Sequence, residues 1–170
     1  MLDGQRTEQA RGLIELCKER GLTIGTAESC TGGLLSACIT AVPGSSSVFE
    51  RGFVTYANAA KMEMLGVDVE LLAAHGAVSE PVARAMAEGV LARAPVDLAV
   101  SITGVAGPGG GSAEKPVGLV FIGSGRKAGD GPEISVERCE FGDVGRNVVR
   151  ERTVAEALDL LTKLAQPSSV

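Results

Sequence analysis

The segment DLAVSITGVAG, residues 97–107, is the feature that most restricts how this chain can fold. It is an almost unbroken run of small and branched apolar residues with the length of a single strand. A strand of this kind is normally buried on both faces of a sheet, because helices cover it on each side. The segment therefore predicts a central strand in a layered α/β fold.

Helices and strands alternate along the rest of the sequence. The final two predicted strands are separated only by a short polar turn, which indicates a hairpin and therefore a mixed sheet. We predict a three-layer α/β/α sandwich that forms one domain over residues 1–170. The remaining strands are expected over residues 22–29, 48–56, 118–125 and 134–141. The helices are expected over residues 7–21, 34–42, 58–66 and 68–76, after Ser79, and from about 143, with Thr7, Asn58 and Ser79 as N-caps.

Charge and composition exclude several classes of partner. The net charge is −5 and no basic run is interleaved with aromatic residues, which argues against nucleic acid as a partner. The four cysteines form no CxxC pair, as is typical of reduced thiols in a cytoplasmic protein. No signal peptide or membrane-length apolar run is present, so no membrane partner is expected. No cluster of side chains has metal-ligand spacing, and we expect neither a metal nor another cofactor.

The first candidate site is TAESCTGG, residues 26–33, where a strand ends and two glycines open a helix. Ser29, Thr31 and Gly32 lie in this turn. N–H groups at a helix start have no intrahelical partners, so they can bind an anion or an oxyanion. The same pattern is typical of an ordinary strand-to-helix turn, and both interpretations remain open.

The second candidate is SITGVAGPGGGS, residues 101–112. A buried strand brings Thr103 to a loop that contains Gly104, Gly107 and three further glycines. The N–H groups of such a loop can surround a phosphate, although the loop lacks the Gly-Lys-Ser/Thr ending of a Walker A motif. A flexible turn without a ligand explains the glycines equally well.

The third candidate is SSSVFERGFVTYANAAK, residues 45–61, which combines Ser46, Tyr56 and Lys61. A lysine amine becomes a general base near neutral pH only if its pKa is lowered, for example by burial. The small and apolar neighbours of Lys61 could provide that burial. A neutral amine can activate a serine without histidine, and the chain has a single histidine. The alternative is a solvated lysine beside a strand-end tyrosine.

Four motifs in order carry a resemblance that covers nearly the whole chain. They are TAESCTGG, GSSSVFERGFVTYANAAKMEMLGV, HGAVSEPVA and SITGVAGPGGGSAEKPVGLV, and together they resemble the C-terminal domain of the competence- and damage-inducible CinA proteins. The resemblance implies a mixed five-stranded sheet and a homo-oligomer. It also implies that a pyridine nucleotide, nicotinamide mononucleotide, is hydrolysed at its carboxamide to nicotinic acid mononucleotide and ammonia. A non-catalytic nucleotide-binding module in a competence or DNA-damage response is the alternative function.

The same resemblance implies a serine, a tyrosine and a lysine as catalytic groups, which match Ser46, Tyr56 and Lys61. A straight strand of eight residues spans about 26 Å, so Ser46 reaches Tyr56 only if the loop folds back or a second subunit contributes it. Ser29, at a strand end beside a helix start, is the second candidate for the nucleophile. The expected substrate-binding residues are Ser29, Thr31, Gly32, Thr103, Gly104, Gly107 and Arg146.

Overall fold

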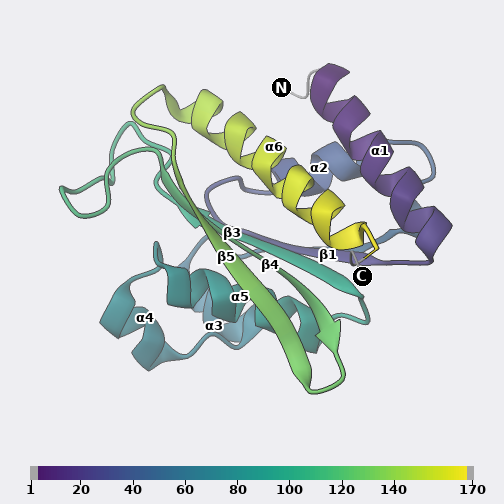
Figure 1. The fold of residues 1–170 in the computed structure, drawn as a ribbon. Helices are drawn as coiled ribbons and strands as arrows, with labels where there is room; N and C mark the ends of the chain where they lie inside the picture. The colour runs from purple at the N-terminus through teal and green to yellow at the C-terminus, as the bar shows by residue number, and fades with distance from the viewer. Residues whose placement is uncertain (1–3, 168–170) are drawn as a thin grey trace.

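A five-stranded sheet forms the middle layer of the computed structural model, which describes residues 4–167 (Figure 1). The strand order is β2-β1-β3-β4-β5, so the strand predicted to be central is central. Every residue of this strand from Leu98 to Thr103 is buried, as its composition predicts. The strands are β1 (Ile24–Glu28), β2 (Phe49–Val54), β3 (Leu98–Gly104), β4 (Leu119–Ala128) and β5 (Gly131–Glu140).

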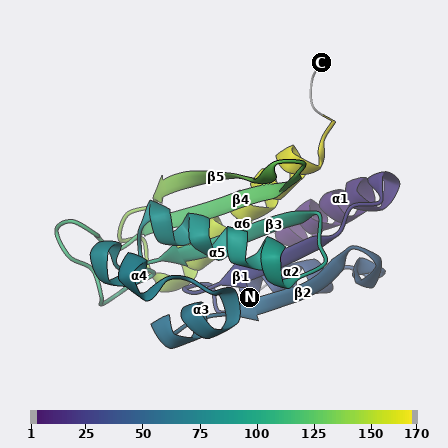
Figure 2. The ribbon, with the colours of Figure 1, turned by 90° about the horizontal axis from the view of Figure 1, so that it is seen from below.

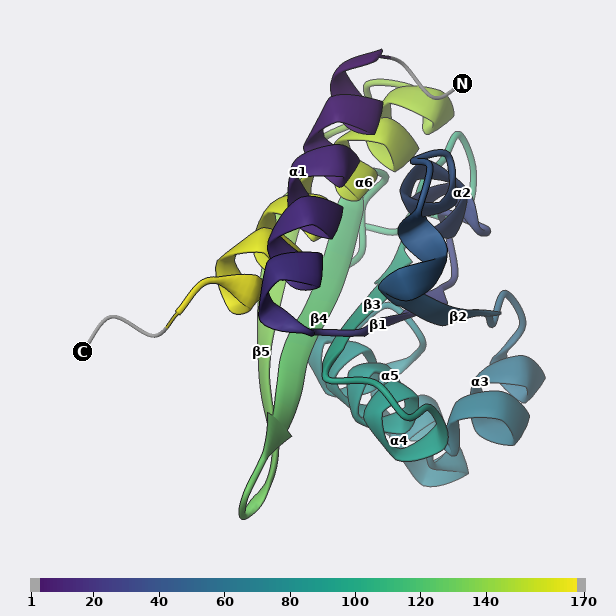
Figure 3. The same ribbon diagram turned by 90° about the vertical axis from the view of Figure 1, so that its right-hand side faces the viewer.

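The sheet is mixed, as predicted. Strands β1, β2 and β3 are parallel to one another, whereas β4 runs antiparallel to β3 and β5 runs antiparallel to β4. The expected hairpin is therefore confirmed, and its tip extends beyond the other strands (Figure 3). The carboxyl ends of the three parallel strands therefore lie at the same edge of the sheet.

Helices cover both faces of the sheet and complete the α/β/α sandwich (Figures 1 and 2). One face carries α1 (Gly4–Arg20), α2 (Leu34–Thr40) and α6 (Arg146–Ala165). The other face carries α3 (Asn58–Leu65), α4 (Val69–His75) and α5 (Glu80–Arg93), and a short 3₁₀ helix, η1 (Ser45–Ser47), precedes β2. Within residues 4–167 no helix is both long and apolar enough to cross a membrane.

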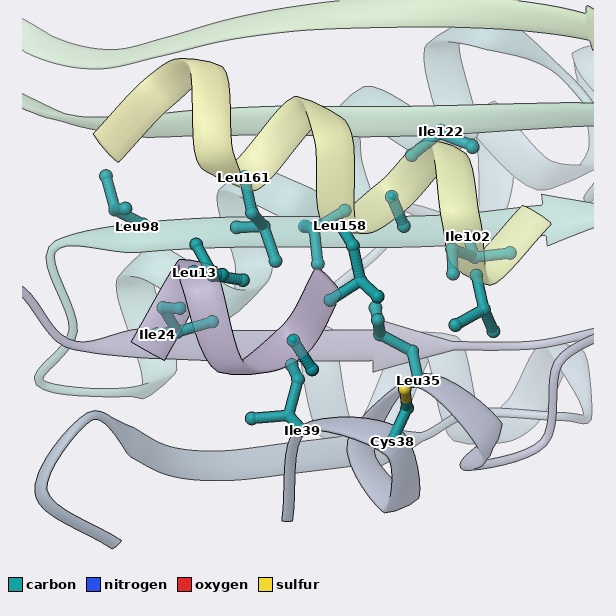
Figure 4. Packing of buried hydrophobic residues seen from close by; sticks show 14 of the residues in the cluster. Leu13, Ile24, Leu35, Cys38, Ile39, Leu98, Ile102, Ile122, Leu158 and Leu161 are labelled. Carbon is teal, nitrogen blue, oxygen red and sulfur yellow. The ribbon is translucent and has the colours of Figure 1, made fainter. Parts of the chain in front are cut away.

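Aliphatic side chains fill both interfaces between the layers. On one face Leu13 of α1 and Leu158 of α6 pack over Ile24 and Ile102 of the sheet (Figure 4). A second cluster, around Met86 of α5, fills the opposite face. Complete burial of one such side chain contributes about 1.5–3 kcal/mol, so the two clusters fix the helices on the sheet, with Phe49, Phe53 and Phe141 only partly buried at their margins.

Two helix starts differ from the sequence-based expectation. The first helix is already formed at Gly4, so Thr7 lies inside it and is not its cap. Helix α3 has Ala57 as its N-cap, and Asn58 is its first helical residue. Helix termini are the part of a helix that local sequence defines least well.

Candidate active site

A cavity lies where the carboxyl ends of β1, β2 and β3 meet. Ser29 follows β1, Tyr56 follows β2 and Thr103 is near the end of β3. Ligands of open α/β sheets bind at this edge. Larger hollows of about 780, 760 and 310 Å³ are also present, and the second shares Gly109 and Gly110 with this cavity, but none of the three brings a hydroxyl against a buried amine. The cavity has a volume of about 280 Å³ and is lined by Ser29, Cys30, Tyr56, Asn58, Lys61, Ala77, Val78, Thr103, Gly104, Val105, Ala106, Gly107, Gly109, Gly110 and Arg146.

Lys61 is the unusual group of this cavity, because its side chain is only 1% exposed. Its Nζ lies 2.8 Å from the carbonyl oxygen of Thr55, 3.2 Å from that of Tyr56 and 3.0 Å from Ser29 Oγ. None of the ion pairs formed within residues 4–167 includes Lys61. Burial therefore lowers the pKa of Lys61 below its ordinary value of 10.5, despite an opposing effect of the Cys30 thiol.

As an ammonium, Lys61 Nζ donates to all three of these oxygens, and loss of one proton leaves a lone pair for one of them. A neutral amine has two N–H donors and one lone pair. If the carbonyl groups of Thr55 and Tyr56 accept the two N–H bonds, the lone pair faces Ser29 Oγ at 3.0 Å. This is the distance at which a base can take a proton from a hydroxyl.

The turn that carries Ser29 is held at several points. The main-chain N–H of Ser29 donates to the carbonyl of Ile102, and the N–H of Gly32 donates to the carbonyl of Ser29, both at 3.0 Å. Arg150 of α6 donates to the carbonyl of Thr31 at 2.8 Å. Ser29 Oγ is therefore presented to Lys61 by a turn that is fixed to β3 and to α6.

The start of α2 is occupied by a side chain of the protein itself. The main-chain N–H groups of Gly33, Leu35 and Ser36 donate to the carboxylate of Glu28 at 2.8–3.1 Å. The predicted anion site at this helix start is thus taken by Glu28. Thr31 and Gly32, which were expected to bind substrate, lie outside the lining of the cavity.

Arg146 spans the cavity between two of its walls. Its Nη1 donates to the carbonyl of Gly107 at 2.9 Å, and its Nη2 donates to the hydroxyl of Tyr56 at 3.0 Å. The hydroxyl of Thr103 donates to the carbonyl of Ala77 at 2.8 Å and so fixes another wall. The guanidinium is thereby held next to the glycine loop, where it can meet an anionic group of a ligand.

A family model described as the CinA C-terminal domain matches residues 6–165. The chain belongs to this family. The nicotinamide-nucleotide amidohydrolase PncC of Escherichia coli is 50% identical over 161 residues, which cover 95% of both chains. A putative competence-damage inducible protein of Symbiobacterium thermophilum is 54% identical over 168 residues, but the match covers 95% of this chain and only 38% of that protein.

Solved structures of CinA proteins have the same fold. The crystal structure of the competence/damage inducible protein CihA from Agrobacterium tumefaciens matches with a TM-score of 0.92 at 48% identity, over 98% of this chain and 99% of that one. The competence damage-inducible protein A from Klebsiella pneumoniae matches with a TM-score of 0.87 at 33% identity. The mixed α/β sheet expected from the motifs is thus the sheet of the family.

Ser46 of this CinA domain lies far from the cavity within one chain. It is an exposed residue of η1, which precedes the first residue of β2, whereas Tyr56 follows the last. Strand β2 has six residues and therefore spans about 20 Å. The register places Phe49, at the start of β2, beside Ile24 at the start of β1, so Ser46 is at the opposite edge of the sheet from Ser29. The loop does not fold back along the strand.

Gly104 has a structural reason to be glycine. A Cβ atom there would lie 2.8 Å from the carbonyl oxygen of Leu119, so the close approach of two strands requires glycine whether or not a ligand binds. Gly104 and Gly107 both line the cavity.

Several cavity residues were not expected to act in catalysis or binding, among them Cys30, Asn58, Ala77 and Val78. Cys30 and Asn58 lie next to predicted residues, and the other two lie in HGAVSEPVA, a motif that already carried the resemblance. Burial raises the pKa of the Cys30 thiol to about 11, so this thiol stays protonated at neutral pH.

Among the described residues, no group of three or more His, Cys, Asp or Glu side chains could hold a metal ion.

Proposed function

We propose that this CinA domain is an amidohydrolase that converts nicotinamide mononucleotide and water to nicotinic acid mononucleotide and ammonia. The observation that carries the proposal is the 3.0 Å contact between the buried Lys61 amine and Ser29 Oγ. The 50% identity to the E. coli amidohydrolase over 95% of both chains supports the substrate class. A buried lysine that faces a serine has no evident purpose in a module that only binds nucleotides.

Ser29 is the nucleophile in this proposal, in place of Ser46. Ser29 Oγ lies on the base and lines the cavity, whereas Ser46 does neither. Nucleophilic catalysis by serine needs a base within hydrogen-bond distance of the hydroxyl. Ser46 would meet Lys61 only if a second copy of the chain delivered it.

The reaction has two halves. Lys61 takes the proton of Ser29 as Oγ attacks the carboxamide carbon, and the tetrahedral intermediate carries its negative charge on the former carbonyl oxygen. The protonated Lys61 then gives its proton to the leaving nitrogen, and ammonia departs. Water attacks the resulting ester with Lys61 again as base, which releases the carboxylic acid and restores Ser29.

Tyr56 holds other catalytic groups in place. Its carbonyl accepts from Lys61 Nζ, and its hydroxyl accepts from Arg146. The side chain is 59% exposed, and its phenol is engaged with Arg146. We therefore assign direct proton transfer to Lys61. Tyr56 orients Lys61 through its carbonyl and Arg146 through its hydroxyl.

Ammonia release tests the proposal directly. The purified protein is incubated with nicotinamide mononucleotide, with and without a chelator, and ammonia and the carboxylate product are measured. Release of both in equal amounts supports the amidohydrolase. If neither forms under any condition although the nucleotide binds, the chain is a nucleotide-binding module.

The rate is expected to rise with pH as Lys61 loses its proton. Because only the neutral amine accepts a proton, kcat/KM should increase as pH passes upward through the pKa of Lys61. Since burial lowers that pKa, the midpoint should lie below 10.5. A pH profile of ammonia release at subsaturating substrate measures it. A rate that falls as pH rises through this range would contradict the assignment of Lys61 as base.

Arg146 is expected to bind the phosphate of the substrate. Replacing Arg146 by methionine removes a charge-assisted hydrogen bond of about 1.5–3 kcal/mol, so KM for the mononucleotide should rise by roughly 10- to 100-fold. Nicotinamide riboside, which lacks the phosphate, should already be a poor substrate of the wild type and should lose little more in the variant.

The matched control for that variant is Arg152→Met, on the exposed side of the same helix. It should leave KM for both substrates within about twofold. Equal efficiency of the wild type on riboside and mononucleotide would remove Arg146 from phosphate binding.

A further inference from the structure

Glu28 is a carboxylate buried without exposure at the end of β1, directly before Ser29. Its Oε2 accepts from the N–H of Gly33 at 3.1 Å and of Leu35 at 3.0 Å. Its Oε1 accepts from the N–H of Ser36 at 2.8 Å and from Ser36 Oγ at 2.7 Å. A buried carboxylate is tolerated when hydrogen bonds satisfy both oxygens, and four donors do so here.

These bonds join the end of β1 to the start of α2 and close the turn between them. Gly33, the N-cap of α2, makes no side-chain capping bond, so Glu28 takes the place of the missing cap. Among the described residues the main-chain N–H of Cys30 has no recorded main-chain acceptor and contacts only its own thiol, and Cys30 lines the cavity. When a nucleophile sits between a strand and a helix, the N–H of the next residue can donate to the oxyanion.

We propose that Glu28 is a positioning residue for the reaction: it holds Ser29 Oγ against Lys61 and directs the N–H of Cys30 towards the oxyanion. This inference rests on the proposed function. Glu28 does not line the cavity and acts only through the turn that it closes.

The carboxylate cannot be replaced by its amide without loss of this geometry. Each oxygen of Glu28 accepts two hydrogen bonds. In Glu28→Gln one oxygen becomes an NH₂ group, which has no lone pair for a main-chain N–H. The turn must move to relieve the opposed donors, and a displacement of about 1 Å at reacting groups lowers the rate by roughly 100-fold.

The experiment compares Glu28→Gln with Asp97→Asn, which changes a carboxylate to an amide directly before β3, next to Thr23 at the start of β1. Asp97 Oδ2 accepts from the N–H and the hydroxyl of Thr23, both at 2.8 Å. We expect Glu28→Gln to lower kcat by about 10- to 100-fold, with KM and the midpoint of the pH profile unchanged. Asp97→Asn should keep kcat even if its melting temperature falls. If both variants lose thermal stability and neither loses kcat, Glu28 is merely structural and the proposal is overturned.

A second readout separates this inference from the proposed function. The rate at which p-nitrophenyl acetate acylates Ser29, followed as the first burst of p-nitrophenolate, does not depend on the nucleotide. A slower burst in Glu28→Gln supports the positioning role even if the wild type hydrolyses no nucleotide, in which case only the proposed function fails. An unchanged burst overturns the positioning role.

Ser36→Ala provides the test if Glu28→Gln does not fold. It removes one donor and leaves the three main-chain donors to Glu28. We expect kcat to fall by about three- to tenfold at unchanged KM, since loss of one donor loosens the turn only in part. An unchanged kcat would overturn the proposal.

Discussion

Replacing Ser29 by alanine is expected to lower kcat by about four orders of magnitude while the mononucleotide still binds. The reason is that the variant keeps the cavity, Lys61 and Arg146 but has no oxygen to attack the carboxamide carbon. Removing the nucleophile of a serine hydrolase leaves only the catalysis that comes from binding and oxyanion stabilisation. Ammonia release gives kcat, and calorimetric titration with the mononucleotide gives the affinity.

Ser46→Ala is the matched control, because it makes the same change at an exposed serine of η1. It should keep kcat within about twofold, as is usual for surface substitutions. The opposite pattern, an inactive Ser46→Ala and a nearly normal Ser29→Ala, would return the nucleophile to Ser46. A second subunit would then have to deliver it to Lys61.

Replacing Lys61 by methionine is expected to lower kcat by about three to four orders of magnitude, because Lys61 is the one base that contacts Ser29 Oγ within residues 4–167. Methionine has a similar length and suits the buried position. Circular dichroism and thermal unfolding check that the variant folds, and ammonia release measures the loss. Lys127→Met, at an exposed lysine of β4, should retain the activity of the wild type.

Lys61→Arg distinguishes a base from a positive charge. A guanidinium keeps its proton at any pH at which the protein is folded, so it can donate but cannot accept. The arginine variant should therefore be about as inactive as the methionine variant. If Lys61→Arg keeps substantial activity, Lys61 stabilises charge in the transition state and another group takes the proton.

The layers of the fold could be predicted because each followed from a local pattern. The apolar run at residues 97–107 required cover on both faces of its strand, and α5 and α6 supply it. The short polar turn between the last two strands specified the hairpin. Both features depend on residues close together in the chain, where side-chain periodicity and turn chemistry are informative.

The pairing at the candidate site could be predicted only in part. Lys61 was expected to need burial, but its partner depends on which strand ends lie together in space. Ser29 and Lys61 are 32 residues apart and meet because β1 and β2 are adjacent and parallel. Ser46 is nearer to Lys61 along the chain, and the extended strand between them is what separates them in space.

The occupied helix start could not be predicted from the motif. TAESCTGG contains both a helix start and Glu28, the acidic residue that binds to it. The linear pattern does not show that the Glu28 carboxylate accepts from the N–H groups of Gly33, Leu35 and Ser36. The Glu28 side chain reaches these N–H groups only because the turn between β1 and α2 is tight, and the motif alone does not specify that conformation.

The two arginines at the start of α6 have a consequence for biosynthesis. Ser29 and Lys61 emerge early from the ribosome, but Arg146 and Arg150, which hold the glycine loop, Tyr56 and the turn after β1, follow later than every strand of the sheet. Domains generally acquire their structure from the amino terminus onward during translation. A nascent chain that has not yet released α6 therefore carries the proposed nucleophile and base without the two arginines, so the proposed site is complete only after α6 has been made.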